Sequence, residues 1–204
     1  MKGKFSIGCI VIIGIVILLA VIMFVYLSSS YNNMVKLNEG VKEKWSQVEN
    51  VYQRRFDLIP NLVETVKGYA RQEKDTFIAV TEARSKAKGT FNVSEEILNN
   101  PAMFEKFQQA QNSLTSALQR LMVVVERYPE LKSNQNFLSL QDQLEGTENR
   151  ITVERKRFNE AARGFNIYIK QFPRVFLARI FGFNEKAYFK ALEGAEAAPK
   201  VKFD

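Results

Sequence analysis

Residues 54–70 read RRFDLIPNLVETVKGYA, and this stretch decides the fold. Apolar residues recur in it every three or four positions on both sides of a proline: Phe56, Ile59, Val63, Val66 and Ala70. That spacing is typical of one face of an α-helix. Ile59 would be a poor N-cap for a new helix beginning at Pro60. The sequence therefore predicts one long helix that is kinked at Pro60, where a hydrogen bond is lost and the ring clashes with the carbonyl of Phe56.

The same apolar stripe continues outward to Val41 and to Phe77. Two further helical stripes follow, one over 101–125 after the capping pair Asn100-Pro101 and one over 135–172. The connection between them is short, which favours antiparallel neighbours. A short helix over 174–181 and a turn at Gly182 complete the pattern. We expect an all-α protein whose domain is an elongated antiparallel helical bundle with a short C-terminal helix.

The other face of residues 54–71 carries a polar stripe of mixed charge: Arg54, Asp57, Asn61, Glu64, Gly68 and Arg71. It is either a solvated surface or a ridge on which a partner docks, and Gly68 would let a neighbour approach closely. Arg55 is also interpreted as lying outside the core. We therefore expect Arg55→Glu to leave helicity unchanged, whereas Val63→Asp should unfold the bundle.

Residues 5–27 contain no charged residue. At ~1.5 Å per residue they reach ~34 Å, enough to cross the ~30 Å hydrocarbon core of a bilayer. The apolar run is longer than that of a secretory signal, and SSS at 28–30 offers no clear cleavage site. The sequence predicts a short basic N-terminus (1–4), an uncleaved transmembrane signal-anchor helix (5–27), a linker (28–33), a helical bundle (34–184) and a tail (185–204) packed on the bundle or extending from it.

Charges beside the span predict its orientation. Lys2 and Lys4 precede it directly, and the first cation after it is Lys36. This favours a cytoplasmic N-terminus and an extracytoplasmic bundle, although Lys42 and Lys44 lie close enough to weaken the bias.

Composition excludes several kinds of chemistry. The chain has no histidine, and its one cysteine, Cys9, lies in the apolar run. Ser-His-Asp triads, Cys-His dyads, His/Cys metal sites and disulfides within one chain are therefore excluded. Asp142, Glu145 and Glu148 are expected on a solvated face where Arg150 or Arg155 neutralises them. We expect no catalytic, cofactor-binding or metal-binding residues.

The net charge of +7 falls to +5 when Lys2 and Lys4 are assigned to the anchor. This mild excess suits lipid headgroups or acidic partners as well as nucleic acid. The basic run at 155–157 is flanked by Glu154 and Glu160, and no recognition motif accompanies it. We expect no nucleic-acid partner.

Aromatic and aliphatic residues crowd into 176–189. Docking against the end of the bundle would bury them. The alternative is a contact with the membrane interface through Arg174, Phe176, Leu177, Arg179 and Ile180. The sequence does not decide which end of the bundle lies near the bilayer.

Two long stretches resemble the LemA family: WSQVENVYQRRFDLIPNLVETVKGYARQEKDTFIAVTEARSKA at 45–87 and RYPELKSNQNFLSLQDQLEGTENRITVERKRFNEAARGFN at 127–166. FP at 172–173, FGF at 181–183 and PKVKFD at 199–204 agree with it. Gln72 stands where a common form of the family carries histidine, so no role of that histidine carries over.

The resemblance implies a bacterial cell-membrane protein with an N-terminal transmembrane helix and an antiparallel helical bundle. It brings no catalytic residue or cofactor. Family members often occur beside membrane metalloproteases, and one branch takes part in building magnetosome membranes.

Three hypotheses follow. The leading one is a non-enzymatic scaffold or adaptor, anchored in the bilayer through residues 5–27, that recruits other envelope proteins or further copies of itself. The alternative is a membrane organiser that binds the lipid surface through its aromatic and basic C-terminal segment. A remote third is an unrecognised hydrolase that uses Tyr, Lys and carboxylate side chains, among them Asp57 and Glu64.

Overall fold

The structure, a computed structural model, describes residues 7–190, and for residues 7 and 92–95 it describes the backbone alone. This part of the chain is helical and contains no strand. Its elements in chain order are α1 (Ile7–Tyr69), α2 (Lys74–Gly89), the short 3₁₀ helix η1 (Thr90–Val93), α3 (Ser94–Asn99), α4 (Pro101–Val125), α5 (Pro129–Lys132), α6 (Gln135–Lys170) and α7 (Arg174–Ile180). The all-α expectation is confirmed.

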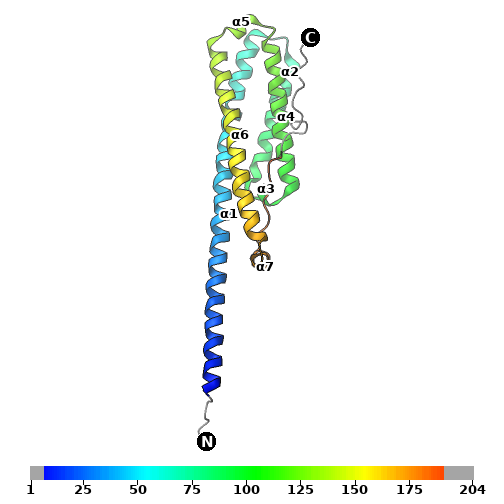
Figure 1. Ribbon diagram of the computed structural model, residues 1–204. Coiled ribbons are helices and arrows are strands. Elements are labelled where there is room, and N and C mark those ends of the chain that lie inside the picture. Colours follow the sequence, from blue (N-terminus) through cyan, green and yellow to red (C-terminus); the bar gives the residue numbers. More distant parts are fainter. Residues whose placement is uncertain (1–6, 191–204) are drawn as a thin grey trace, which may run out of the picture.

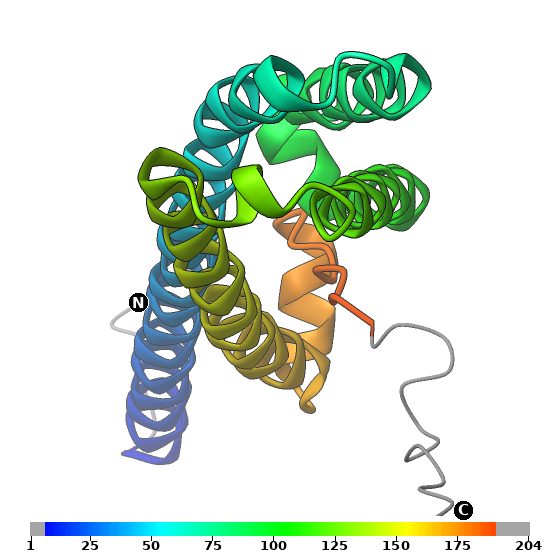
Figure 2. The same cartoon turned by 90° about the horizontal axis from the view of Figure 1, so that it is seen from above.

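Four long helices form an elongated antiparallel bundle on top of the N-terminal part of α1 (Figure 1). α1 packs along α6, and α2 packs along α4. Seen from above, these two pairs stand side by side (Figure 2). α5 caps the end far from the N-terminus, whereas α7 lies at the end from which α1 leaves the bundle (Figure 1).

Aromatic rings fill the middle of the core. Trp45 of α1 lies with its ring centroid 5.5 Å from that of Phe107, 5.3 Å from that of Phe158 and 6.1 Å from that of Phe189. These partners come from α4, from α6 and from the segment that follows α7. Edge-to-face pairs of this kind are worth about 0.5–1.5 kcal/mol each beyond the area that they bury. The core therefore joins α1, α4, α6 and the segment after α7 at one level.

The candidate membrane span and the first bundle helix are one continuous helix. Residues 28–33, expected to form a linker, belong to α1. Ser30 and Met34 are buried, and the Tyr31 ring packs against the Phe181 ring with a centroid distance of 4.9 Å. Tertiary packing thus holds the polar SSSYNN stretch in helical form, overriding its weak propensity.

α1 ends earlier than its apolar stripe suggests. The helix stops at Tyr69, and Lys74 begins α2, which turns back along the bundle. The turn is closed by bonds from Ala70 N to Val66 O (2.9 Å) and from Glu73 N to Ala70 O (3.0 Å). Ala70 and Phe77 are both buried, so the apolar spacing continues across the break by coincidence. Extending the first helix to Phe77 was wrong.

α1 does pass through Pro60 without ending, as predicted. Pro60 has no amide hydrogen to donate to the carbonyl of Phe56. Arg84 of α2 supplies the missing donor, since its Nε lies 2.8 Å from Phe56 O. The backbone group freed by the proline thereby becomes a contact between α1 and α2.

The tail expected over 185–204 is described as far as Lys190, and within it Phe189 is buried in the core. Residues 191–204, the basic segment 1–4 and the first two residues of the expected span lie outside the described residues.

Candidate functional site

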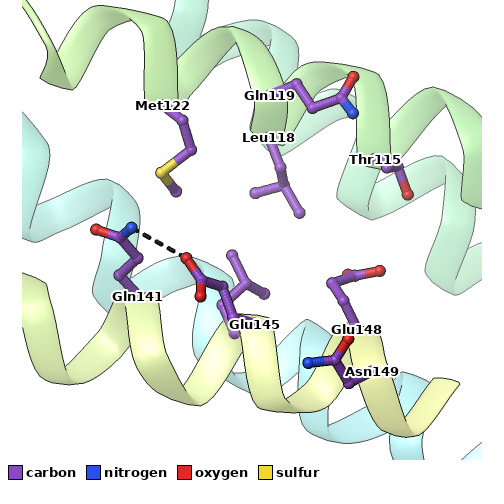
Figure 3. Close-up of a pocket in the computed structure, with 9 residues that line it drawn as sticks. Thr115, Leu118, Gln119, Met122, Gln141, Glu145, Glu148 and Asn149 are labelled. Atoms are coloured by element: carbon purple, nitrogen blue, oxygen red, sulfur yellow. Dashed lines mark hydrogen bonds between the residues drawn. The ribbon is translucent and has the colours of Figure 1, made fainter. Parts of the chain in front are cut away.

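A groove runs between α4 and α6, the two long helices that share little direct packing. Its upper part has a volume of about 450 Å³. Leu118 and Met122 of α4 point into it, Leu144 of α6 also lines it, and the other lining side chains are polar (Figure 3). The lining residues are Thr115, Leu118, Gln119, Met122, Gln141, Leu144, Glu145, Glu148 and Asn149.

A second cavity of about 240 Å³ continues the groove toward the end of the bundle from which α1 leaves. It shares Thr115, Gln119 and Glu148 with the upper part. Arg55 lies at its base and Arg155 at its side. The groove therefore changes from an apolar floor to a cationic one along its length.

Arg55 is buried in the core, with 1% of its surface exposed. Its Nη1 donates to Glu148 Oε1 at 3.0 Å and to Thr115 Oγ1 at 3.2 Å, and its Nη2 donates to Gln111 Oε1. Gln111 in turn donates to the carbonyl of Ala87 at 3.4 Å. One guanidinium thus connects α1, α4 and α6, and Gln111 extends the network to α2.

The same guanidinium lies 4.9 Å from the centre of the Tyr52 ring, a cation–π distance. Burial raises the pKa of the Tyr52 phenol above its ordinary value, while Arg155 and Arg55 oppose that shift and Glu148 adds to it. The phenol is therefore neutral at physiological pH, as this buried position requires.

The lowest part of the groove is filled by the chain itself. Residues 183–190, which have no regular secondary structure, run antiparallel to α6. Asn166 donates to Lys186 O and accepts from Lys186 N, both at 2.8 Å. Asn159 makes the same pair of bonds with Phe189 at 2.9 Å.

A third amide repeats this pattern from the other wall. Gln108 of α4 donates to Lys190 O at 2.9 Å and accepts from Lys190 N at 3.2 Å. An amide side chain that both donates and accepts satisfies both polar groups of one residue's backbone. Three amide side chains of the bundle thus bind the backbone of this segment, while its Phe189 side chain is buried in the core.

The chemistry of the groove suits binding and offers little for catalysis. Among the described residues no three His, Cys, Asp or Glu side chains gather as metal ligands. Amides, hydroxyls and one buried guanidinium can hold a polypeptide.

The predicted polar stripe is brought together only in part. Arg54, Asp57, Asn61, Glu64 and Gly68 lie exposed on the outer face of α1, away from the groove. Arg71 falls beyond the end of the helix, in the turn to α2. A Cβ atom added to Gly68 would have no described atom within 4 Å, apart from its own helix backbone and its sequence neighbours. No other helix therefore approaches Gly68 closely.

The sequence analysis did not predict the ion pair between Arg55 and Glu148. Arg55 was interpreted as exposed, but it lies in the core, and the expected tolerance of Arg55→Glu is wrong because a carboxylate there would face Glu148. Glu148 was assigned to a solvated face. The available signal was position: Arg55 lies three residues after Tyr52 and four before Ile59, both buried, so it shares their face.

The five residues proposed for membrane contact separate into two groups. Phe176, Arg179 and Ile180 are exposed. Leu177 packs against the core, and the Arg174 guanidinium lies 4.2 Å from the centre of the Tyr168 ring. Two exposed aromatic residues nearby, Phe172 and Phe181, were not among the predicted contacts.

The LemA family model matches residues 44–203. Magnetosome protein MamQ 2 of Paramagnetospirillum magneticum is 29% identical over 192 residues, which cover 86% of this chain and 71% of that protein. MamQ of Magnetospirillum gryphiswaldense is 29% identical over 174 residues, covering 78% of this chain and 64% of that protein. Protein LemA of Metamycoplasma hominis is 22% identical over 182 residues, covering 89% and 78%.

Proposed function

Because this chain belongs to the LemA family, we propose that it is a non-enzymatic scaffold or adaptor of the bacterial cell membrane. It is a membrane-associated helical protein, with one helix among the described residues long and apolar enough to cross a bilayer. In the proposal, residues 5–27 span the membrane and the bundle presents the groove between α4 and α6 to an extended segment of another envelope protein.

One observation carries this proposal. The groove already holds a peptide backbone through three amide side chains, and it continues past Lys190 with walls of the same chemistry. Amides and hydroxyls line both walls of that continuation, together with the carboxylates of Glu145 and Glu148 and the guanidinium of Arg155. Main-chain recognition in a groove of this kind gives affinity, and the pockets along it give specificity.

The compartment and the partners remain part of the proposal. Lys2 and Lys4 before the span favour an extracytoplasmic bundle in the inner membrane. Envelope proteins, membrane metalloproteases and further copies of this chain are the partner classes, and nucleic acid is not among them. The outer polar stripe of α1, from Arg54 to Gly68, is a second docking surface on the opposite side.

A lipid-surface role is the second candidate function. Exposed aromatic side chains gather on α7 and directly beside it, at the end of the bundle from which the candidate span leaves (Figure 1). Two of the similar proteins are named magnetosome proteins, which supports a role in organising a membrane. The two roles are compatible, since the lipid contact orients the bundle at the membrane and the groove of the bundle binds the partner.

Photo-crosslinking in intact cells tests the scaffold role. A benzoylphenylalanine at Gln119, on the rim of the groove, is compared with one at Arg120, an exposed neighbour that does not line it. We expect crosslinks to a discrete protein from position 119 and none from 120. The proposal is wrong if both positions give the same crosslinks, or if position 119 reaches only residues of its own chain.

A further inference from the structure

Three apolar side chains form a patch on the membrane end of the bundle. Phe172, Phe176 and Ile180 are spaced by four residues, and 82%, 57% and 74% of their surfaces are exposed. The rings of Phe172 and Phe176 pack edge to face at 5.9 Å. Large aromatic side chains grouped in this way on a surface usually mark an interaction site. We call these three residues the foot patch.

The foot patch is held rigidly, so its exposure does not come from a loose helix. Ala178 on the opposite side of α7 is buried, and Leu177 packs against the core. Gly182, with a φ of 74°, closes the helix, and Phe183 N donates to Ala178 O at 2.9 Å. A left-handed residue followed by such a bond is a helix-ending motif that fixes the direction of the chain. The patch therefore faces away from the bundle.

α1 determines how far the foot patch lies from the membrane span. The Tyr31 ring contacts the rings of Phe181 and Phe183 at 4.9 and 6.0 Å. The apolar run ends at Leu27, and Tyr31 comes four residues later. Along a continuous helix this is about 6 Å. The polar layer on each face of a bilayer is about 5–8 Å thick. Phe181, directly after α7, consequently lies at the level of the lipid headgroups.

Arg179 adds a cation at the edge of the foot patch, where its side chain is exposed. Aromatic rings with neighbouring cations are the residues that membrane interfaces favour. We propose that the foot patch inserts into the interface of the bilayer that the same chain spans. This inference rests on the proposed anchor at residues 5–27.

A second contact with the bilayer has a consequence for the bundle. A single spanning helix leaves its domain free to tilt and to rotate about the helix axis, whereas interfacial aromatic anchors restrict both. The span and the foot patch together hold the bundle upright and fix the direction in which the groove between α4 and α6 faces.

Depth-dependent quenching in nanodiscs tests this placement. The full chain with Cys9→Ser is reconstituted at one copy per disc in phosphatidylcholine and phosphatidylglycerol that carry a nitroxide just below the headgroup. An NBD label is attached in turn at Phe176→Cys, at Leu18→Cys in the span and at Val123→Cys. The last two sites are 59% and 65% exposed, which matches Phe176, and Val123 lies near the far end of α4.

We expect the lipid nitroxide to quench the label at position 176 at least roughly threefold more strongly than the label at 123, because an interfacial side chain lies within reach of the acyl chains. Equal quenching at 176 and 123, with strong quenching at 18, overturns the inference and leaves the anchor standing. Weak quenching at position 18 contradicts the anchor itself.

A second labelling site guards against damage to the patch by the label. With NBD at Arg179→Cys, quenching should fall to the level of position 123 when Phe172→Ser and Ile180→Ser are added. Unchanged quenching shows that the patch does not hold α7 at the membrane, which contradicts the inference. The inference is also contradicted if the label at position 176 moves into an apolar environment only when each disc holds two copies, because a second copy then covers the patch.

Discussion

The guanidinium of Arg55 on α1 lies 3.0 Å from the Glu148 carboxylate on α6, beneath the groove. Arg55 is buried, whereas the Glu148 side chain is 36% exposed, so the pair bridges the core and the groove. The Arg55 guanidinium also donates hydrogen bonds to Gln111 and Thr115 on α4. The two walls of the groove, which share few close backbone contacts, are thus also connected through one side chain of a third helix.

Adjacent arginines allow a matched test of this connection. Arg55→Ala should lower the free energy of unfolding by about 2 kcal/mol or more, because Gln111 and Glu148 lose a charged donor. Arg54→Ala removes one exposed bond to Gln143 and should change it by less than about 0.5 kcal/mol. Chemical denaturation of the full chain in detergent, followed by circular dichroism, measures both. Equal losses for the two variants would show that Arg55 is not the buried connector.

The bond from Arg84 to the carbonyl of Phe56 exists because Pro60 cannot donate there. Arg84→Met should therefore cost about 1.5–3 kcal/mol in the native chain, the range for a hydrogen bond to a charged group. In a Pro60→Ala background the amide of residue 60 can satisfy the carbonyl, so the same change should cost less. A double-mutant cycle on thermal unfolding gives the coupling, and additive losses would refute it.

Tyr52 predicts how stability changes at alkaline pH. Burial is the chief reason why the pKa of the Tyr52 phenol is raised above 10.0 in the folded chain. At a pH between 10.0 and this raised pKa, the folded state keeps a proton that the unfolded state loses. Its contribution is fully present below pH 10 and is lost as pH rises through the folded pKa. The difference in melting temperature between the native chain and Tyr52→Phe, measured from pH 8 to 11, isolates this contribution. A difference that does not vary with pH would contradict it.

The amide pair between Asn159 and Phe189 should hold residues 183–190 in the groove. Asn159→Leu should speed hydrogen exchange across this segment, because two backbone bonds are lost. Asn149→Leu, also on α6, replaces an exposed amide without a bond to the segment and serves as control. Mass spectrometry of the exchanged full chain reports both. If Asn149→Leu speeds exchange as much as Asn159→Leu, the amide pair does not hold the segment.

Periodicity was sufficient for the helices whose ends carry clear signals. Asn100, which precedes Pro101, caps α4 with its side-chain oxygen, and Asn134 caps α6 in the same way. The apolar stripe over 135–172 predicted α6 closely. The break between α1 and α2 was missed because Arg71, Gln72 and Glu73 are good helix formers. What ends α1 is tertiary: Gln72 donates to the Tyr128 hydroxyl at 2.9 Å, and Arg127 lies 3.3 Å from Glu73.

The groove could not be predicted from the sequence for a similar reason. Asn159, Asn166 and Gln108 look like ordinary helix-surface residues, and only the folded chain brings them to one backbone segment. The foot patch was anticipated in Phe176 and Ile180. Its place beside the membrane end of α1 depends on which end of the bundle α7 occupies, and this follows from packing rather than from local pattern.

Continuity of α1 through residues 28–33 carries both proposals, because it fixes the bundle and α7 relative to the membrane span. Hydrogen exchange of the full chain in nanodiscs tests it directly, since these amides lie outside the expected span and are protected only if the helix continues through them. We predict slow exchange throughout 28–33, similar to that of Trp45 and its neighbours. Exchange at the rate of an unstructured peptide would mean that a flexible linker separates the span from the bundle, which would contradict the account.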